Sequence, residues 1–505
     1  MREFLLQQRG YAVFFNSFHF LLFLFLVLYF FLVFLPGAVG GYATLFPLLI
    51  SVLFLAEVLQ ALHKVYLRKH KRPRITLKSL LVMGSTLIIE MGIFLLALVT
   101  LQESITPSRV ALFLALLALL DDDINASVVF FFNACTRAVK THLFKKARSK
   151  RLSFPDLKVV GITGSYGKSS VKEILTHLLE GQFKVVKTEK NTNTEIGIAQ
   201  TILKKVKQEH EVFVCEMGAY SSGEVKVCCF MAKPEIGVFT GLNEQHGALF
   251  GSLDKTFRAK WELALSLPPE GILIVNTDSS ELADRLKTCP GLTLACSTHS
   301  GEYRAEHIEI TPDSVSFQYQ GVHFLAPLVG GFQVVNLLMS VVAAEQLGMS
   351  LSDIAERMKT VRLPSKTLTA LPFSQGIILD DSYNVNPDGL RGALAHLDLY
   401  EDYQKVLFFP GILELGESSE DLHRELGEQI GQHVDYVFFF DPNFSEILSK
   451  AAFRGGLTRE HVFTLETPDL MAEQLSLLFE HHKGKKWVLL FESRGAEMIM
   501  DSLLN

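Results

Sequence analysis

The chain has 505 residues, of which 49% are hydrophobic and only 20% charged, and its mean hydropathy is +0.26. Soluble domains average about 25% charged residues, so the chain is short of charge, and its length allows roughly three domains. This composition excludes a disordered chain and a small disulfide-rich domain. Residues 1–120 carry ten basic and four acidic residues, whereas the remainder carries 38 basic and 50 acidic ones. We therefore expect a basic, apolar N-terminal part, an acidic part of ordinary composition, and no nucleic-acid partner.

The N-terminal part predicts a membrane anchor. No Asp, Glu, Lys or Arg occurs between Gly10 and Ala56, a stretch longer than the about 20 residues that one membrane span needs. The apolar pattern, divided by turn residues, predicts a transmembrane region of residues 1–135 with about four helices, near 13–35, 42–62, 79–101 and 107–120. Glu90 falls within the third helix, where a carboxylate is either functional or hydrogen-bonded in the packing.

Basic residues indicate how this anchor is oriented. They cluster between the second and third predicted helices and again in a juxtamembrane linker of residues 136–154. Lys and Arg favour the cytoplasmic side and anionic lipid headgroups. We expect a multi-pass protein of the bacterial inner (cytoplasmic) membrane, with membrane lipid as a partner and its later domains in the cytoplasm. A cleaved signal peptide ending near Ala38 is the alternative. The six cysteines lack metal-ligand spacing, which favours reduced thiols.

Beyond residue 155, short apolar runs alternate with amphipathic helical patterns, which is typical of an α/β fold. Residues 155–362 predict a mononucleotide-binding central domain, with strands near 157–163, 183–187, 211–216, 235–240 and 271–276. A hinge is expected at LPSK (363–366). Residues 363–505 predict a smaller, Rossmann-like domain, with strands near 376–381, 405–409, 435–440, 462–465 and 486–492. A nucleotide would lie between these two domains.

A glycine-rich loop follows the first of these strands. It reads GSYGKSS over residues 164–170, and a helical pattern continues after it. A strand, a GKS loop and a helix together form a phosphate-binding P-loop, because glycines let backbone N–H groups approach phosphate. Lys168 would reach the terminal phosphates, and Ser169 could ligate magnesium. Ile162 stands where the usual spacing has its first glycine, so an ordinary glycine turn stays an alternative.

Several further segments, in the same order along the chain, resemble the Mur ligase family of peptidoglycan-precursor enzymes. They are TGSYGKSS (163–170), NTNTEIG (191–197), EMGAYSSGEV (216–225), TGLNEQHGALFGSLDKTFRAKWEL (240–263), DDSYNVNP (380–387) and GILELGESSEDLHRELG (411–427). The resemblance implies an ATP-dependent ligase. In such an enzyme a carboxylate attacks the γ-phosphate of ATP to form an acyl phosphate, and an amine then displaces phosphate to form an amide.

The resemblance also assigns site residues. It implies that the catalytic residues are Lys168, Lys260 and His246. It places ATP on Thr163, Gly164, Ser165, Tyr166, Gly167, Lys168, Ser169, Ser170, Asn276, Asn336, Lys366 and Asp381. It places two Mg²⁺ ions on Ser169, Glu216, His246 and Lys260, with Lys260 carbamylated. The alternatives are that Glu216 caps a helix, that His246 is a hydrogen-bonded polar residue, and that Lys260 is a solvated helix residue.

The chain departs from the family pattern at several positions. Gly241 replaces an asparagine, Phe332-Gln333 replaces His-Asn, Phe491-Glu492 replaces Lys-Gly, and Lys366 replaces an arginine that could bind in a bidentate manner. The predicted anchor stands where the family has a UDP-sugar domain, so the carboxylate substrate could be lipid-linked or membrane-delivered as well as a small molecule, and both stay open. The amine would come from an amino acid or dipeptide. Two alternatives stay open: another Mur ligase (glutamate-adding or polymerising), or an inactive membrane-bound nucleotide-binding scaffold.

Overall fold

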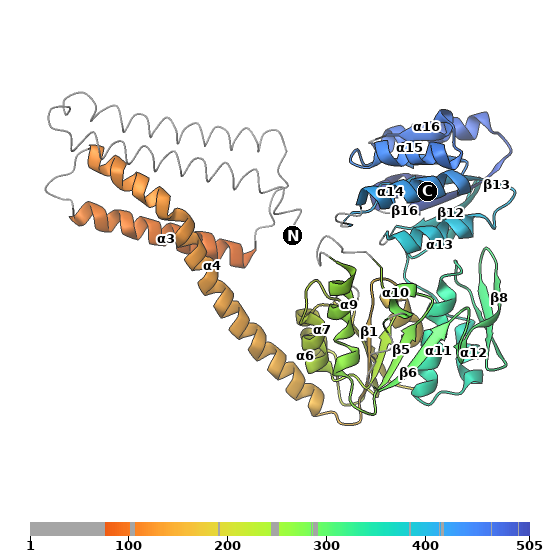
Figure 1. The fold of residues 1–505 in the computed structure, drawn as a ribbon, viewed down its shortest axis with the longest axis horizontal. Helices are drawn as coiled ribbons and strands as arrows, with labels where there is room; N and C mark the ends of the chain where they lie inside the picture. Colours follow the sequence, from red (N-terminus) through yellow and green to blue (C-terminus); the bar gives the residue numbers. More distant parts are fainter. Residues whose placement is uncertain are drawn as a thin grey trace. The chain divides into compact units, whose positions relative to one another are not determined.

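The computed structural model of the chain contains two compact units, residues 1–142 and 143–505, which we describe separately (Figure 1). The structure describes residues 76–100, 107–189, 192–243, 252–283, 285, 291–382, 385–413, 415, 419–465, 467–492 and 494–504. The first two predicted transmembrane helices, 13–35 and 42–62, and the predicted site residue His246 lie outside these ranges.

The first unit contains α3 (Leu77–Thr100) and the first part of α4 (Pro107–Leu152). Polar groups join the two helices. The Thr86 hydroxyl donates to Asn125 Oδ1 at 3.0 Å, and Lys78 Nζ donates to Asn133 Oδ1 at 2.8 Å. The first of these contacts is partly buried and the second is exposed, so Thr86 is the polar side chain that packs between the helices.

The predicted multi-pass location in the bacterial inner membrane is wrong. Among the helices that the structure describes, none combines the length and the apolar character needed to cross a bilayer. The apolar segment 107–120 is not a separate helix that ends at the three aspartates. It is the beginning of a 46-residue helix that continues through Asp121, Asp122 and Asp123 and through the predicted linker. Fourteen residues of helix span only about 21 Å, short of a hydrocarbon core of about 30 Å.

The last turns of α4 belong to the second unit and pack against it. Ala147 is fully buried, and Leu143 and Phe144 pack beside it against the same core. The buried Arg151 guanidinium binds three backbone carbonyl groups, donating to Leu157 O at 2.6 Å, Phe154 O at 2.8 Å and Ala232 O at 3.1 Å. This side chain therefore ties the end of α4 to the start of the α/β fold.

The central sheet has seven parallel strands in the order β2-β3-β1-β4-β5-β6-β7. Its strands are β1 (Lys158–Thr163), β2 (Val185–Lys187), β3 (Val212–Glu216), β4 (Ile236–Phe239), β5 (Ile272–Asn276), β6 (Leu292–Ser297) and β7 (Tyr303–Arg304). Parallel strands need cover on both faces. One face packs against α5 (Lys168–Leu179), α11 (Gln333–Gln346) and α12 (Leu351–Met358). The other packs against α6 (Glu195–Lys204), α7 (Glu224–Ala232) and α9 (Leu253–Trp261).

A three-stranded antiparallel sheet, β10-β9-β8, lies next in the chain and packs on α11 and α12. Its strands are β8 (Glu306–Ile310), β9 (Val315–Tyr319) and β10 (Val322–Ala326), and the short α10 (Ser280–Ala283) precedes β6. Phe317 and Phe324 stack across two of these strands with ring centroids 5.3 Å apart. The sheet thus extends the core that covers the P-loop helix.

The C-terminal domain is a six-stranded sheet in the order β11-β12-β16-β13-β14-β15, in which only the edge strand β11 is antiparallel. Its strands are β11 (Thr369–Phe373), β12 (Gly376–Asp381), β13 (Tyr403–Phe409), β14 (Tyr436–Phe439), β15 (Val462–Thr464) and β16 (Lys486–Glu492). Helices α13 (Pro387–Leu397), α14 (Ser419–His433) and α15 (Ser445–Gly455) cover one face, and α16 (Pro468–His481) and α17 (Glu497–Leu504) cover the other. The predicted α/β fold with a parallel central sheet and a C-terminal domain is confirmed.

Replacing Arg151 with methionine should destabilise the second unit by about 3 kcal/mol, because three buried carbonyl groups would lose their donor. The measurement is urea unfolding followed by fluorescence of the two tryptophans, Trp261 and Trp487, which report on the two ligase domains. The matched control is Arg148→Met, because Arg148 is partly exposed and donates to one carbonyl group. A cost for Arg151→Met no larger than that of the control would contradict this role.

Candidate active site

The P-loop is held by close backbone packing. It connects β1 to α5, and Gly167 at the start of the helix has φ +75°, a left-handed conformation that glycine adopts readily. At Gly164, a Cβ atom would lie 2.1 Å from Thr240 Oγ1. The loop therefore needs glycine for both backbone conformation and space, and it turns the N-terminus of α5 toward open space, as an anion-binding loop requires.

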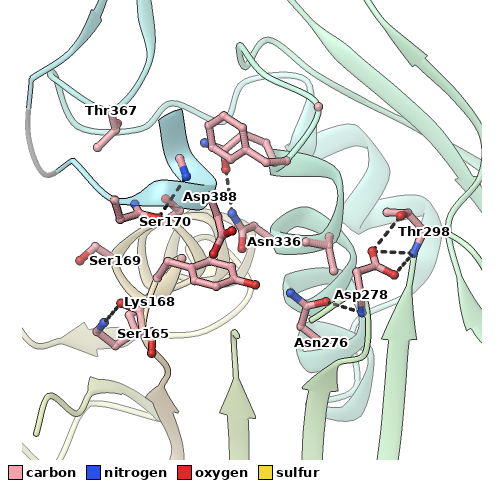
Figure 2. Close-up of a pocket in the computed structure, with 18 of the residues that line it drawn as sticks. Ser165, Lys168, Ser169, Ser170, Asn276, Asp278, Thr298, Asn336, Thr367 and Asp388 are labelled. Atoms are coloured by element: carbon pink, nitrogen blue, oxygen red, sulfur yellow. Dashed lines mark hydrogen bonds between the residues drawn. The ribbon is translucent and has the colours of Figure 1, made fainter. Parts of the chain in front are cut away.

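That space is a pocket of about 420 Å³ (Figure 2). It is lined from the central domain by the P-loop, the ends of β5 and β6 and the start of α11, and from the C-terminal domain by the end of β12 and the start of α13. The lining residues are Ser165–Ser170, Asn276, Asp278, Thr298, His299, Gly331, Phe332, Gln333, Val335, Asn336, Thr367, Asp381, Asn386, Asp388 and Gly389. Both ligase domains thus contribute to one cavity, at the carboxyl ends of parallel strands, where α/β proteins bind ligands.

Lys168 and Lys260 converge on one backbone oxygen. Lys168 Nζ donates to Gly164 O at 2.8 Å and to Ser165 O at 2.9 Å, and Lys260 Nζ donates to Gly164 O at 3.0 Å. Burial lowers the pKa of Lys168, although nearby Glu216 opposes this shift. Burial and then the positive charge of Lys168 hold the pKa of Lys260 well below its usual value. Lys260 is 2% exposed, so the alternative of a solvated helix lysine is wrong.

Glu216 lies at the end of β3, beside the start of α5. Its Oε2 accepts hydrogen bonds from Ser169 Oγ and Lys172 Nζ, both at 3.0 Å, and its Oε1 accepts one from Asn193 Nδ2 at 3.0 Å. Burial alone would raise the pKa of Glu216, but Lys172 and Lys168 lower it overall. The carboxylate is therefore ionised, and its side chain bonds the P-loop serine instead of capping a helix.

The Ser169 and Glu216 oxygens fit a magnesium ion. Mg²⁺ takes oxygen ligands at about 2.0–2.1 Å in octahedral geometry, so neighbouring ligand oxygens lie about 2.9 Å apart, close to the 3.0 Å between Ser169 Oγ and Glu216 Oε2. No group of three His, Cys, Asp or Glu side chains able to hold a metal occurs among the described residues. This donor set suits Mg²⁺, which commonly uses one or two carboxylates together with substrate phosphates and water.

The predicted asparagines lie in the pocket with hydrogen-bonding partners. Asn276 Nδ2 donates to Thr240 O at 2.9 Å, and its Oδ1 accepts from Asp278 N at 2.9 Å. Asn336 Nδ2 donates to Gln333 Oε1 at 3.1 Å. Figure 2 shows both asparagines on the side of the cavity formed by the central domain. Asn276 at the end of β5 is therefore bonded to Thr240 just after β4. This bond holds the two strand ends together and positions the lining of the cavity.

Three predicted nucleotide-binding residues lie elsewhere. The Thr163 hydroxyl donates to Met217 O at 2.9 Å and is fully buried. Gly164 lies behind the pocket lining, where its carbonyl group binds the two lysines. Lys366 Nζ pairs with Glu497 Oε1 at 2.9 Å and does not line the pocket. In contrast, Asp381 lines the pocket, with one carboxylate oxygen accepting from Leu368 N at 3.0 Å.

Sequence reasoning missed several polar residues of the pocket: Asp278, Thr298, His299, Thr367, Asn386 and Asp388. A signal existed for two of them. Asn386 precedes Pro387, a helix-start pattern, and its Oδ1 caps α13 by accepting from Gly389 N at 3.0 Å. Asp278 follows the end of β5 and accepts from Thr298 N at 2.9 Å, which links two adjacent strand ends.

Two of the departures from the family pattern, Gly241 and Phe491, fit closely against neighbouring rings, whereas Glu492 is buried without a hydrogen bond. At Gly241, a Cβ atom would lie 2.3 Å from Tyr166 Cζ, so the ring of Tyr166 fills the space that a larger residue would need. Phe491 is buried and stacks on Phe408 with ring centroids 4.4 Å apart. Glu492 is 1% exposed and neither of its carboxylate oxygens has a hydrogen-bond partner in the described structure. Burial, followed by the charge of Asp381, raises its pKa well above the usual value.

Comparison with known proteins agrees with this geometry. Residues 162–344 match the Mur ligase middle domain, and residues 369–492 match the Mur ligase, glutamate ligase domain. The two matches together span more than half of the chain, which therefore belongs to the Mur ligase family. This assignment confirms the predicted class of enzyme, an ATP-dependent carbon–nitrogen ligase.

Similar proteins include UDP-N-acetylmuramoyl-tripeptide–D-alanyl-D-alanine ligases from several bacteria. The one from Bacillus subtilis is 29% identical over 288 residues, which cover 56% of this chain and 62% of that protein. The one from Escherichia coli is 29% identical over 279 residues, covering 54% and 61%. The chain thus spans somewhat less than two thirds of the length of these relatives.

Two solved structures, both of MurF enzymes, resemble the fold of this chain. MurF from Acinetobacter baumannii superposes with a TM-score of 0.65 at 26% identity, covering 72% of this chain and 80% of that one. MurF ligase from Thermotoga maritima, solved in complex with ADP, superposes with a TM-score of 0.61 at 25% identity, covering 72% and 83%.

Replacing Asp381 with asparagine should flatten the pH dependence of stability between pH 4 and 7. Burial raises the pKa of Asp381 to about 7 from 3.8, and Asp380 adds to this shift while the Leu368 N–H opposes it. At pH values between the ordinary pKa of 3.8 and the raised pKa of about 7, the unfolded state binds fewer protons than the folded state. The wild type therefore loses stability as pH rises through this range. Urea unfolding across this range measures the slope. The exposed Asp402→Asn is the control, and an unchanged slope in Asp381→Asn would contradict the assignment.

Proposed function

We propose that this protein is an ATP-dependent ligase of peptidoglycan synthesis that joins a carboxylate to an amine. The reaction would be the one for which its relatives are named, the addition of D-alanyl-D-alanine to UDP-N-acetylmuramoyl-tripeptide. The observation that carries the proposal is the convergence of Lys168, Ser169 and Glu216 at the start of α5, beside a pocket lined by both ligase domains. The complex of the Thermotoga maritima enzyme with ADP supports ATP as the nucleotide.

The P-loop would bind the triphosphate through the backbone N–H groups at the start of α5. The substrate carboxylate attacks the γ-phosphorus, the bond to the β-phosphate oxygen breaks, and an acyl phosphate and ADP form. The amine nitrogen then attacks the acyl carbon, phosphate leaves, and the nitrogen loses a proton. Lys168 would turn from its own loop carbonyl groups to the transferring phosphoryl group, where a fixed cation stabilises the developing charge.

Ser169 and Glu216 would hold a magnesium ion, which neutralises charge on the phosphates when bound. A second ion would use His246 and a carbamylated Lys260, as the family resemblance implies. The buried position of Lys260 supports carbamylation, because a lowered pKa leaves more of the neutral amine. In that reaction the amine nitrogen bonds to the carbon of CO₂ and releases a proton.

Carbamylation predicts an NMR signal. Protein equilibrated with ¹³C-bicarbonate should show a carbamate carbon resonance that is lost in Lys260→Met and kept in Lys158→Met. Lys158 is an exposed lysine at the opposite end of the P-loop strand β1. A spectrum of Lys260→Met identical to that of the wild type would show that Lys260 is not carbamylated.

The pocket walls suggest which part of the nucleotide each domain would contact. The P-loop lies at the end that would take the phosphates, and Asn276, Asn336 and Asp278 line the cavity farther along the sheet, where the nucleoside would lie (Figure 2). Asp381 and Asp388 approach from the C-terminal domain. A nucleotide in this cavity would therefore contact both domains and favour their closed arrangement.

The identity of the two substrates is the least constrained part of the proposal. The sequence left a small soluble and a lipid-linked carboxylate open. No helix among the described residues is long and apolar enough to span a membrane, and the relatives' names support a UDP-linked peptide. Another Mur ligase activity would show as a preference for a different amine. An inactive nucleotide-binding scaffold is opposed by the intact set of Lys168, Glu216 and Lys260.

The test is phosphate release from ATP, measured with UDP-linked and lipid-linked muramoyl peptides and with a panel of amino acids and D-alanyl-D-alanine. Release should require both a carboxylate and an amine substrate. Lys168→Ala and Lys260→Ala should each lower the rate at least 100-fold, as loss of a transition-state cation does, and Lys158→Ala should retain it. Substrate-dependent release that neither substitution affects would overturn the mechanism.

A further inference from the structure

A row of alternating charges, increasingly buried, leads from the edge of the central sheet to Glu216. Lys187 on β2 pairs with Glu173 on α5, Lys172 Nζ lies 3.4 Å from Glu173 Oε1, and the same Nζ lies 3.0 Å from Glu216 Oε2. Side-chain exposure falls along the row, from 30% at Lys187 and 19% at Glu173 to 3% at Lys172 and 6% at Glu216. The row therefore ends in a buried, closely contacted ion pair at the candidate metal ligand.

The spacing along α5 explains why these groups meet. Ser169, Lys172 and Glu173 are separated by three and four residues, so they lie on one face of the helix, and that face lies against the end of β3. Ser169 and Lys172 both donate to the same carboxylate oxygen, Glu216 Oε2. The Lys172 cation thus lies beside Glu216 Oε2, the oxygen that would bind the candidate magnesium ion together with Ser169 Oγ.

This position has an electrostatic consequence. A lysine ammonium 3.0 Å from Glu216 neutralises the carboxylate, and like charges a few ångströms apart repel strongly where water is excluded. Lys168 adds a second cation close by. No cluster of three metal-binding side chains is present in the described part of the chain. Without phosphates, the site therefore has little net negative charge to attract a divalent cation.

We propose that Lys172 is a resident counter-cation of Glu216, which positions the carboxylate and makes divalent-cation binding there depend on the phosphates of the nucleotide. This inference rests on the proposed function, because it takes Ser169 and Glu216 as the magnesium ligands. The triphosphate supplies the negative charge that outweighs Lys172. An enzyme built in this way binds metal and nucleotide together and does not hold a metal ion in the empty site.

The experiment is titration of the full-length protein with Mn²⁺, a paramagnetic substitute for Mg²⁺, measured as free ion by electron paramagnetic resonance. Wild type should bind Mn²⁺ at this site only when a non-hydrolysable ATP analogue is present. Lys172→Met should bind Mn²⁺ without nucleotide, at least tenfold more tightly than wild type. Lys172→Arg keeps the charge and should behave like wild type. A misfolded variant would lose binding, so tighter binding cannot result from structural damage.

Two controls assign the effect to this pair. Glu173→Gln changes the next member of the row but keeps Lys172, so it should gain no nucleotide-independent binding. Glu216→Gln in the Lys172→Met background should abolish the gained binding. If Lys172→Met does not fold, Lys172→Gln removes the charge but keeps a hydrogen-bond donor, and the same gain is expected.

The outcomes separate this inference from the proposed function. If wild type retains no Mn²⁺ even with the nucleotide analogue, the magnesium site of the proposed function fails. If wild type binds Mn²⁺ with the analogue but the folded, uncharged Lys172 variants gain no nucleotide-independent binding, the role of Lys172 is overturned while the proposed function stands. Equal Mn²⁺ binding by wild type with and without the analogue would also overturn the role of Lys172.

Discussion

The site depends on the close contact between the P-loop and the ends of the two strands beside β1. On one side, Gly164 lies so near Thr240, just after β4, that no side chain fits between them. On the other side, Ser169 bonds to Glu216 at the end of β3. Parallel strands bring these ends to one edge of the sheet, so the order β3-β1-β4 fixes the loop from both directions. The lysines, the carboxylate and the helix N-terminus keep their relative positions because of this contact.

The loop that follows β4 connects the central domain to the C-terminal domain. Asn243, three residues after Thr240, donates from Nδ2 to Asp388 Oδ2 at 2.9 Å, and Asp388 lines the pocket. Phe332 at the start of α11 packs so closely on Gly392 of α13 that a Cβ atom there would lie 2.6 Å from its ring. Contacts at both sides of the cavity therefore cross between the two domains.

The sequence predicted ten strands of the two large sheets, but none of the antiparallel sheet of β8, β9 and β10, although β9 is mostly buried. The strands near 157–163, 211–216 and 486–492 are continuous apolar runs in the middle of sheets, and the structure has strands there. It did not predict β8, because only the middle one of its five residues is even partly buried. The three aspartates after residue 120 suggested the end of a helix, but local charge does not end a helix whose backbone hydrogen bonds continue. Lys366 and Thr163 were assigned by motif position, and motif position does not determine which partner a side chain finds.

The departures from the family pattern divide by domain, which bears on substrate specificity. In the central domain Gly241 is compensated, because Tyr166 occupies the vacated space, and Lys168, Glu216 and Lys260 remain in place. In the C-terminal domain Phe491 has become part of the core, and Glu492 is a buried carboxyl group in register with Asp381 on the adjacent strand. Phe491 thus stands where the family has a lysine, and Glu492 adds a second acidic group beside Asp381 at the carboxyl ends of β12 and β16. In the proposed function the phosphoryl transfer would depend on the unchanged residues, so a difference in the amine substrate would originate at these strand ends of the C-terminal domain.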